Sequence, residues 1–227
     1  MSQIQYLDLH RADYMQTLLL QQRLVERLIA GENAPGYLLL VEHDPPVITL
    51  GRRSTPEQVR ASADRLSSMG IEIHRVNRGG GATYHGPGQL VAYPIFNLQY
   101  FKLGLHEYLR KLEEVLIRLL GDYGINAGRI AGLTGVWVAD EKIASIGIAV
   151  RKWISYHGLA LNVRPNMSHF DLIIPCGITD KRPTSMRRLV GDKISVQQIK
   201  KPLIDRFADV FGYGSAVEAP CRQLTGA

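Results

Sequence analysis

The sequence has few cysteines and lacks a long apolar run, and each shortage excludes a class of protein. Only two of the 227 residues are cysteine, which is too few for a disulfide scaffold or for a structural zinc site made of four thiolates. No apolar stretch approaches the roughly 18 residues of a membrane-spanning helix. The N-terminal segment is polar from the start, unlike a secretory signal. We therefore expect a cytoplasmic protein with no membrane partner.

The composition is that of an ordinary globular protein with an excess of positive charge. Hydrophobic residues make up 45% and charged residues 21% of the chain, which argues against disorder. The net charge is +6, and residues 180–206 alone carry eight basic and three acidic side chains. A basic surface suits an acidic partner. Few aromatic residues are interleaved with these charges, so base stacking is not indicated and we expect no nucleic acid partner.

The spacing of apolar residues predicts long helices and antiparallel hairpins in mixed order. This pattern favours an α/β fold of the α+β type and argues against a doubly wound parallel sheet. The length fits one catalytic domain spanning residues 1–227, and a small C-terminal subdomain from about residue 180 stays open as an alternative. The expected helices cover residues 12–30, 55–69, 104–123 and 195–211. The expected strands cover residues 37–42, 46–50, 71–76, 89–96, 136–139, 142–150 and 156–163.

The densest signal is a glycine-rich stretch, in which five of twelve residues are glycine. It reads Arg78-Gly79-Gly80-Gly81-Ala82-Thr83-Tyr84-His85-Gly86-Pro87-Gly88-Gln89. It is neither a P-loop nor a dinucleotide-binding motif, because the required spacings are missing. Glycine lets the backbone approach a ligand closely. The stretch is therefore either a tight connection between strands or a slot for a long, thin substrate.

Two further stretches place polar residues in apolar surroundings. Lys142 opens an apolar strand, where alternation would put it on the face of Ala144 and Ile146, with Ser145 on the other face. The alternative is a lysine at a hairpin end that reaches into water. His157, beside a glycine in the next strand, is more often a structural histidine.

Cys176 lies in a Pro-Cys-Gly turn after an apolar run. Most cysteines on apolar stretches are inert core residues. The rigid Pro175 and the flexible Gly177 on either side suggest instead that the Cys176 thiol is accessible for reaction. A reactive thiol would require a lowered pKa. Cys221 lies in a polar tail and is interpreted as incidental.

Four blocks in this order resemble the lipoyl(octanoyl) transferases: RGGGATYHGPGQLVAYPI, KIASIGI, HGLALNV and PCGI, between residues 78 and 178. These enzymes move an octanoyl group from acyl carrier protein to a lysine of lipoyl domains. The resemblance implies a mixed, largely antiparallel sheet flanked by helices, the fold shared with lipoate and biotin ligases. It implies no cofactor and no metal. Its expected partners are octanoyl-acyl carrier protein as donor and, as acceptors, the lipoyl domains of 2-oxoacid dehydrogenases and the glycine cleavage H protein.

The resemblance also implies residue roles. Cys176 would be the acyl-thioester nucleophile, and Lys142 would lower its pKa and transfer protons. The residues implied to line the acyl site are Arg78, Gly79, Gly80, Gly81, Ala82, Thr83, Tyr84, His85, Ser145, Ile146, Gly147, Gly158, Leu159 and Ala160.

Two other classes of function are alternatives to the transferase interpretation. One is an ATP-dependent lipoate- or biotin-protein ligase, and the other is a non-catalytic binder of lipoyl domains or nucleic acid. Attack of a cysteine on a thioester is nearly isoenergetic, so the transferase would need no nucleotide. A covalent intermediate would let two protein substrates visit the site in turn.

Overall fold

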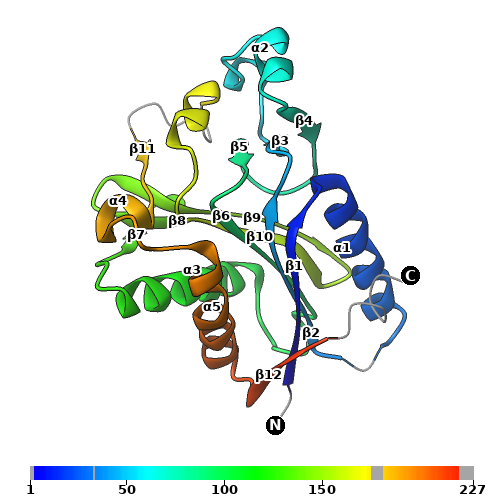
Figure 1. Ribbon diagram of the computed structural model, residues 1–227. Helices are drawn as coiled ribbons and strands as arrows, with labels where there is room; N and C mark the ends of the chain where they lie inside the picture. Colours follow the sequence, from blue (N-terminus) through cyan, green and yellow to red (C-terminus); the bar gives the residue numbers. More distant parts are fainter. Residues whose placement is uncertain (1–2, 33, 175–180, 220–227) are drawn as a thin grey trace.

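The computed structural model describes residues 3–32, 34–174 and 181–219. Over these residues a nine-stranded sheet has the order β12-β1-β2-β6-β10-β9-β8-β7, and β11 pairs with β9 (Figure 1). Five strand pairs are antiparallel, and three are parallel. The expected mixed, largely antiparallel sheet is confirmed. The strands are β1 (Gln3–Ala12), β2 (Gly36–His43), β6 (Gln89–Phe96), β7 (Gly128–Ile130), β8 (Leu133–Val138), β9 (Glu141–Arg151), β10 (Ile154–Asn162), β11 (Arg182–Pro183) and β12 (Ser215–Glu218).

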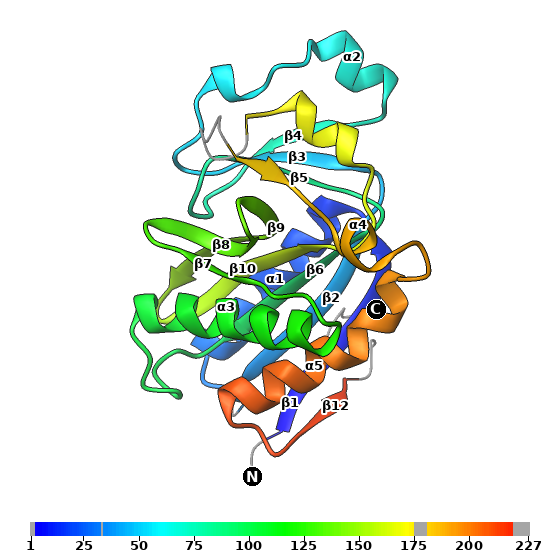
Figure 2. The ribbon, with the colours of Figure 1, turned by 90° about the vertical axis from the view of Figure 1, so that its left-hand side faces the viewer.

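Helices cover both faces of this sheet (Figure 2). The long helices are α1 (Tyr14–Ile29), α3 (Leu105–Asp122) and α5 (Val196–Phe211), as the sequence predicted. Apolar residues of α1 pack on one face of β2, β6 and β10. Apolar residues of α3 and α5 pack on the other face and join the largest core cluster. The sequence signal at the start of α5 is confirmed, because the Gln198 side chain accepts a hydrogen bond from the Ser195 N–H at 2.9 Å.

A smaller three-stranded sheet lies beyond one end of the large sheet (Figure 2). Its order is β4-β3-β5, and it has its own apolar cluster, which includes Ile48, Tyr84 and Phe170. Its elements and neighbours are β3 (Val47–Leu50), a 3₁₀ turn at Pro56–Gln58, α2 (Ala63–Ser68), β4 (Glu72–Arg75), β5 (Ala82–His85) and a second 3₁₀ turn at Met167–Leu172.

The expected helix over residues 55–69 is wrong in its first half. Thr55 makes no side-chain cap hydrogen bond, and Val59 is extended and forms a bridge to Ile173. The Gln58 side chain accepts a hydrogen bond from the Ala82 N–H at 2.8 Å. These tertiary contacts replace helical hydrogen bonds, and α2 begins only after Ser62, whose hydroxyl accepts from the Arg65 N–H.

Strand β1 was not predicted. It lies inside the sheet, parallel to both β2 and β12. Its burial does not alternate, because both faces of the sheet are covered: Ile4 packs in the core cluster on one face and Leu7 in the cluster on the other. A strand with so little alternation leaves a weak sequence signal.

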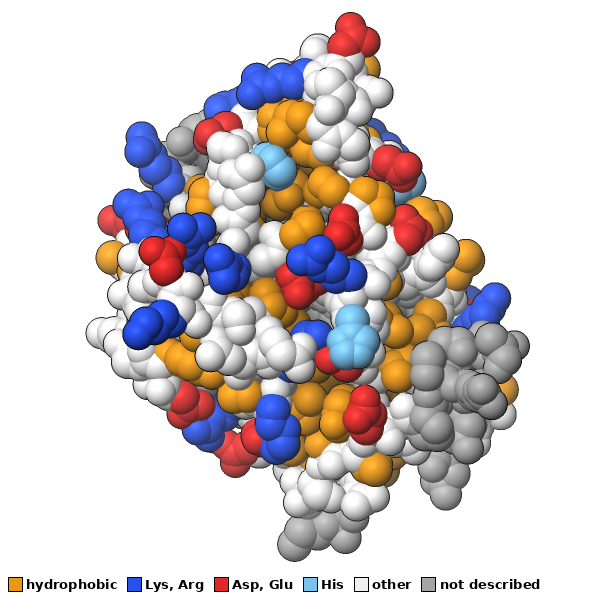
Figure 3. All heavy atoms as spheres, in the orientation of Figure 1, with side chains coloured by type: hydrophobic (Ala, Val, Ile, Leu, Met, Phe, Trp, Pro, Cys, Tyr) orange, Lys and Arg blue, Asp and Glu red, His pale blue; other side chains and the backbone are white. Residues whose placement is uncertain are grey.

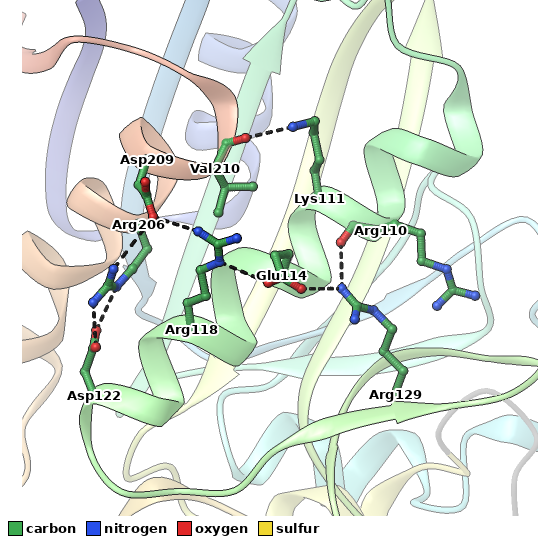
Figure 4. Close-up of polar contacts among 9 residues, drawn as sticks. All are labelled: Arg110, Lys111, Glu114, Arg118, Asp122, Arg129, Arg206, Asp209 and Val210. Atoms are coloured by element: carbon green, nitrogen blue, oxygen red, sulfur yellow. Dashed lines mark hydrogen bonds and ion pairs between the residues drawn. The ribbon is translucent and has the colours of Figure 1, made fainter.

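Charged side chains join α3 to α5 along their exposed seam (Figure 4). The Arg118 guanidinium bridges Glu114 at 3.0 Å and Asp209 at 2.9 Å. Arg206 pairs with Asp122. Exposed pairs of this kind contribute little individually, so the seam fixes the relative position of the two helices more than it adds stability.

Residues 181–219 share the sheet and core of the rest of the chain. Strand β11 pairs with β9 and β12 pairs with β1, while the buried pair of Lys200 and Asp8, 2.7 Å apart, joins α5 to β1. The single-domain organisation stays a prediction. Among the helices of the described residues, none combines the length and apolar character that a membrane crossing requires.

Candidate active site

A cavity of about 460 Å³ is lined by residues of both sheets, α1 and α3. This volume lies in the range of small-molecule sites. Thirteen residues that the sequence singled out line it: Arg78, Gly79, Gly80, Gly81, Thr83, His85, Lys142, Ser145, Ile146, Gly147, Gly158, Leu159 and Ala160. Segments far apart in the chain are therefore brought to one place.

Two of the expected lining residues lie elsewhere. Ala82 and Tyr84 belong to the cluster within the small sheet, because side chains on β5 alternate between its two faces. The Tyr84 hydroxyl instead hydrogen bonds to Nδ1 of His169 at 2.7 Å, and burial raises its pKa to about 12. The two cysteines, Cys176 and Cys221, lie outside the described residues.

The glycine-rich stretch crosses the end of β9 at close range. The Gly79 N–H donates to the Ile148 carbonyl at 2.9 Å. A Cβ added to Gly147 would lie 2.9 Å from the Gly79 carbonyl oxygen. Gly80 has φ +90, a conformation that favours glycine. Gly79 of the glycine-rich stretch and Gly147 of β9 thus lie in direct backbone contact.

Arg78 is a buried cation in the cavity wall. Its guanidinium donates to the carbonyl oxygen of Thr49 at 2.7 Å, to the Thr49 hydroxyl at 2.8 Å and to the Gly79 carbonyl at 3.0 Å. These bonds fix the orientation of the planar group, which has several donors. The positive charge also contributes to lowering the pKa of His157 and His85.

His85 is held as a neutral acceptor. The Gln89 amide nitrogen donates to Asn162 Oδ1 at 2.9 Å, so Gln89 Oε1 accepts from His85 Nδ1 at 2.7 Å. The lone pair therefore resides on Nε2. Burial, reinforced by His43, lowers the pKa of His85 to about 3.

His43 adjoins this group and is also neutral. Its Nδ1 lies 3.2 Å from the Ala12 carbonyl, to which it donates, and the Tyr93 hydroxyl donates to Nε2 at 2.7 Å. Burial lowers the pKa of His43 to about 4. Tyr14 stacks against His85 with ring centroids 6.3 Å apart.

His157 is both structurally satisfied and part of the cavity wall. Its Nε2 donates to Asn77 Oδ1 at 3.1 Å, and its backbone N–H donates to Gln21 at 2.9 Å. It has φ +56, which is uncommon for a residue other than glycine. Burial, followed by the charge of Arg78, lowers the pKa of His157 to about 3.

The expected face of Lys142 is wrong. Val136 pairs with Ala144 but Trp137 pairs with Lys142, so the register shifts by one residue. Because Val136 and Trp137 point to opposite faces of β8, Lys142 points away from the face of Ala144. Its ammonium lies 4.9 Å from the centroid of the Trp137 ring. The alternation of apolar and polar residues in the sequence does not reveal a bulge of this kind.

A buried carboxylate fixes the strand next to Lys142. Glu113 on α3 accepts from Arg110 at 2.7 Å and from Arg129 at 3.0 Å. Its other oxygen accepts from the Gly135 N–H at 3.2 Å. Three donors from three segments thus position β8 against α3, and Gly135 lies beside Lys142.

Strand β9 changes partners along the cavity. It pairs with β10 throughout residues 144–151. On its other side, β8 pairs as far as Ala144, and the Gly79 N–H reaches the carbonyl of Ile148. Outward-facing backbone groups recur every second residue, so Ile146 has the same orientation as Ile148. Within the described ranges, no strand pairs with Ile146 on this side.

Sequence reasoning missed the apolar and basic residues that complete the cavity wall. Leu105 and Leu109, one helical turn apart on α3, and Leu133 on β8 supply apolar surface. Arg52 and Arg53 supply charge. The spacing of the two leucines was visible in the sequence, but nothing local indicated that this face of the helix borders a cavity.

The basic stretch 180–206 is largely charge-compensated. Figure 3 shows acidic side chains among the basic ones near β11 and the short helix α4 (Met186–Val190). Six of its eight basic residues have an acidic partner. The pairs are Lys181 with Asp140, Arg187 with Asp192, Arg188 with Glu141, Lys200 with Asp8, Lys201 with Asp205 and Arg206 with Asp122. The stretch therefore presents less free positive charge than its composition suggested.

Known proteins resemble the chain over most of its length. It is 46% identical over 200 residues to an octanoyltransferase of Thermoanaerobacter sp. (strain X514), covering 88% of this chain and 86% of the relative. It is 46% identical over 222 residues to an octanoyltransferase of Acidobacterium capsulatum, covering 91% and 89%. A crystal structure of lipoate-protein ligase A bound with ATP superposes with a TM-score of 0.80 at 19% identity, covering 100% of this chain and 92% of the other.

The last similarity shows a shared fold, whereas the first two extend to the sequence. The family described as Lipoyl protein ligase A/B catalytic domain matches residues 13–208. That range contains the glycine-rich stretch, the β9 lysine and the cavity wall on β10. The chain therefore belongs to the lipoyl protein ligase A/B catalytic domain family.

Proposed function

We propose that this protein is an octanoyltransferase that moves an octanoyl group from octanoyl-acyl carrier protein to a lysine of lipoyl domains. The observation that carries the proposal is the sequence identity of 46% to octanoyltransferases over nearly the whole chain. The acceptors are the lipoyl domains of 2-oxoacid dehydrogenases and the glycine cleavage H protein. The cytoplasm is the proposed location.

The cavity suits a medium-length acyl chain. Leu105, Leu109, Leu133, Ile146 and Leu159 give it an apolar wall, and burial of each methylene contributes about 0.8 kcal/mol. The glycine-rich loop meets β9 through backbone atoms at Gly79 and Gly147, so neither residue places a side chain in this part of the cavity. Each methylene that fits should therefore change binding by about fourfold.

The proposed chemistry has two steps through a thioester on Cys176. The Cys176 sulfur attacks the carbonyl of the donor thioester, a new carbon–sulfur bond forms, and the carrier thiol leaves with a proton from Lys142. The neutral amine of the acceptor lysine then attacks the acyl-enzyme, forming the amide and releasing the Cys176 thiolate, while its proton passes to Lys142. Neither step consumes a nucleotide.

The position of Lys142 supports its role. Its ammonium lies over the Trp137 ring and its side chain lines the cavity. An ammonium within about 4–6 Å of a thiol favours the thiolate and lowers the thiol pKa. Lys142 also lines a small pocket with Thr83, Ser145 and Lys181, and Lys181 follows Cys176 by five positions in the sequence.

Intact mass spectrometry after incubation with octanoyl-acyl carrier protein tests the proposal. We expect one octanoyl adduct that hydroxylamine removes, that is absent in Cys176→Ala and that persists in Cys221→Ala. Addition of a lipoyl domain should discharge the adduct and leave the domain octanoylated. An adduct on Cys221, or no adduct on an enzyme that still turns over, would contradict the cysteine mechanism.

The same assay separates the transferase from an ATP-dependent ligase. Free octanoate with ATP and magnesium should leave the lipoyl domain unmodified, and EDTA should not reduce transfer from the carrier protein. Octanoylation of the lipoyl domain from free octanoate and ATP would instead favour the ligase. Binding of the lipoyl domain without any transfer would favour a non-catalytic role.

A further inference from the structure

Arg52 and Arg53 form a pair of cations at the mouth of the cavity. Both line the cavity and both are exposed, so the two residues lie where the cavity meets solvent. In the part of the chain that the structure describes, neither forms an ion pair. This distinguishes them from most basic residues in the stretch 180–206.

The backbone that carries this pair is fixed to the glycine-rich loop. The Arg52 N–H donates to the Arg78 carbonyl at 3.0 Å, and the Arg53 N–H donates to the Gly80 carbonyl at 3.1 Å. A Cβ on Gly51 would lie 2.5 Å from the Gly80 carbonyl oxygen, so the turn is packed directly on the loop. The backbone positions of the two arginines are therefore fixed relative to the glycine-rich wall of the cavity.

We propose that Arg52 and Arg53 bind the phosphate of the phosphopantetheine arm on the acyl donor, an inference that rests on the proposed function. In this donor one flexible arm links the acyl thioester to a phosphodiester. The acyl group must enter the apolar cavity, whereas the phosphate must stay in solvent near the opening. Guanidinium groups match phosphate oxygens in geometry and charge. Among the described residues, Arg52 and Arg53 are exposed cations that line this cavity and form no ion pair.

The test removes the phosphate and the arginines separately. The donors are octanoyl-pantetheine, which lacks the phosphate, and octanoyl-4′-phosphopantetheine, and the readout is the rate of octanoyl-enzyme formation without acceptor. In the wild type we expect about a tenfold preference in kcat/KM for the phosphorylated donor, the size of a charge-assisted hydrogen bond. In Arg52→Gln/Arg53→Gln this ratio should fall towards 1.

The matched control is Arg65→Gln/Arg75→Gln. These two arginines are exposed on α2 and β4 of the same small lobe and do not line the cavity. The control removes the same net charge, so it should keep the tenfold preference. The preference should also shrink with added salt in the wild type, because the contact is exposed to solvent. Equal melting temperatures for the wild type and both variants would establish that folding is unchanged.

Each outcome bears on a different statement. If the wild type forms the octanoyl-enzyme with no preference, or Arg52→Gln/Arg53→Gln keeps the preference, the phosphate site is overturned and the transferase stands. If this variant instead raises the KM for the lipoyl domain alone, the pair binds acidic residues of the acceptor and the proposal is wrong. If no thioester donor, including octanoyl-carrier protein, acylates the wild type, the proposed function fails and this inference fails with it.

Discussion

Gly135 lies directly against the side chain of Lys142. A Cβ added to Gly135 would lie 2.6 Å from Lys142 Cε and 3.4 Å from Nζ, and 2.7 Å from the carbonyl oxygen of Ala144. Gly135 also has φ +124, in the region that only glycine adopts easily. Any other residue here would displace the lysine stem or β8, so the path of Lys142 depends on a residue with no side chain.

We expect Gly135→Ala to slow octanoyl-enzyme formation by about tenfold or more, because a displacement of about 1 Å in a reacting group can cost as much as a hundredfold. The matched control is Gly124→Ala, where φ is +70 but nothing lies within 4 Å of the added Cβ. Both changes should destabilise the fold by about 1–3 kcal/mol through backbone strain. Single-turnover rates measure the displacement of Lys142, and urea titrations measure the loss of stability. Equal rates in both variants would contradict a role of Gly135 in positioning Lys142.

Lys142 should lower the pKa of the Cys176 thiol. We expect Lys142→Ala to raise the apparent pKa towards about 8.5, the value of a free thiol. The measurement is the pH dependence of alkylation by iodoacetamide in a Cys221→Ala background. Lys142→Arg should keep the lowered pKa but turn over poorly, since guanidinium does not release its proton. An alkylation profile that is the same with and without Lys142 would exclude the ion pair.

The two proposed catalytic residues should act as a unit. If Lys142 works only through the Cys176 thioester, the double variant Lys142→Ala/Cys176→Ala should lose scarcely more activity than Cys176→Ala alone. The comparison uses kcat/KM for octanoyl-carrier protein in the two single variants and the double variant. Additive losses would show that Lys142 contributes independently of the cysteine.

Two paired glycines in neighbouring strands should respond differently to alanine. At Gly147 the added Cβ would meet the Gly79 carbonyl at 2.9 Å and Arg78 Cδ at 3.2 Å, so Gly147→Ala should push the loop away and raise the KM for the donor severalfold. At Gly158 it would lie 2.2 Å from the Ala92 carbonyl oxygen within the sheet. Gly158→Ala should therefore destabilise the fold by at least about 2 kcal/mol. Urea titrations and donor kinetics on both variants check this contrast.

Acid should destabilise the protein through its buried histidines. Burial lowers the pKa to about 4 at His43 and to about 3 at His85 and His157, below the usual value near 6.5. The unfolded chain then binds more protons between these values, so their stabilising contribution is complete above about pH 6.5 and falls as the pH drops towards 3–4. Each histidine should contribute up to about 1.4 kcal/mol per pH unit in this window. His157→Asn should reduce the slope of unfolding free energy between pH 6 and 5 by about that amount, and an unchanged slope would contradict the assignment.

The sequence predicted features with strong local signals. The periodicity of α1, α3 and α5 identified the helices, and the glycine-rich stretch identified one wall of the cavity because it needs glycine at a backbone contact. It did not predict the bulge that turns Lys142 towards the face of Trp137, since one extra residue between paired strands changes no composition. It also missed the break at Val59, where a bridge to Ile173 outweighs a plausible helix start. The two arginines at the cavity mouth were missed because only folding brings residues 52 and 53 to the glycine-rich loop.

The partner change along β9 bears on how the protein avoids self-association. A strand edge with unpaired N–H and C=O groups is a template for strands of other chains, and sheets usually shield such edges. Here the stretch at Ile146 that no described strand pairs with on the side away from β10 is short, and it lies between the start of β8 and the glycine-rich loop, inside the cavity wall. A neighbouring strand cannot reach it without opening the cavity, whereas a thin ligand can. The site can thus keep backbone hydrogen-bonding capacity available to a substrate without exposing a surface that promotes aggregation.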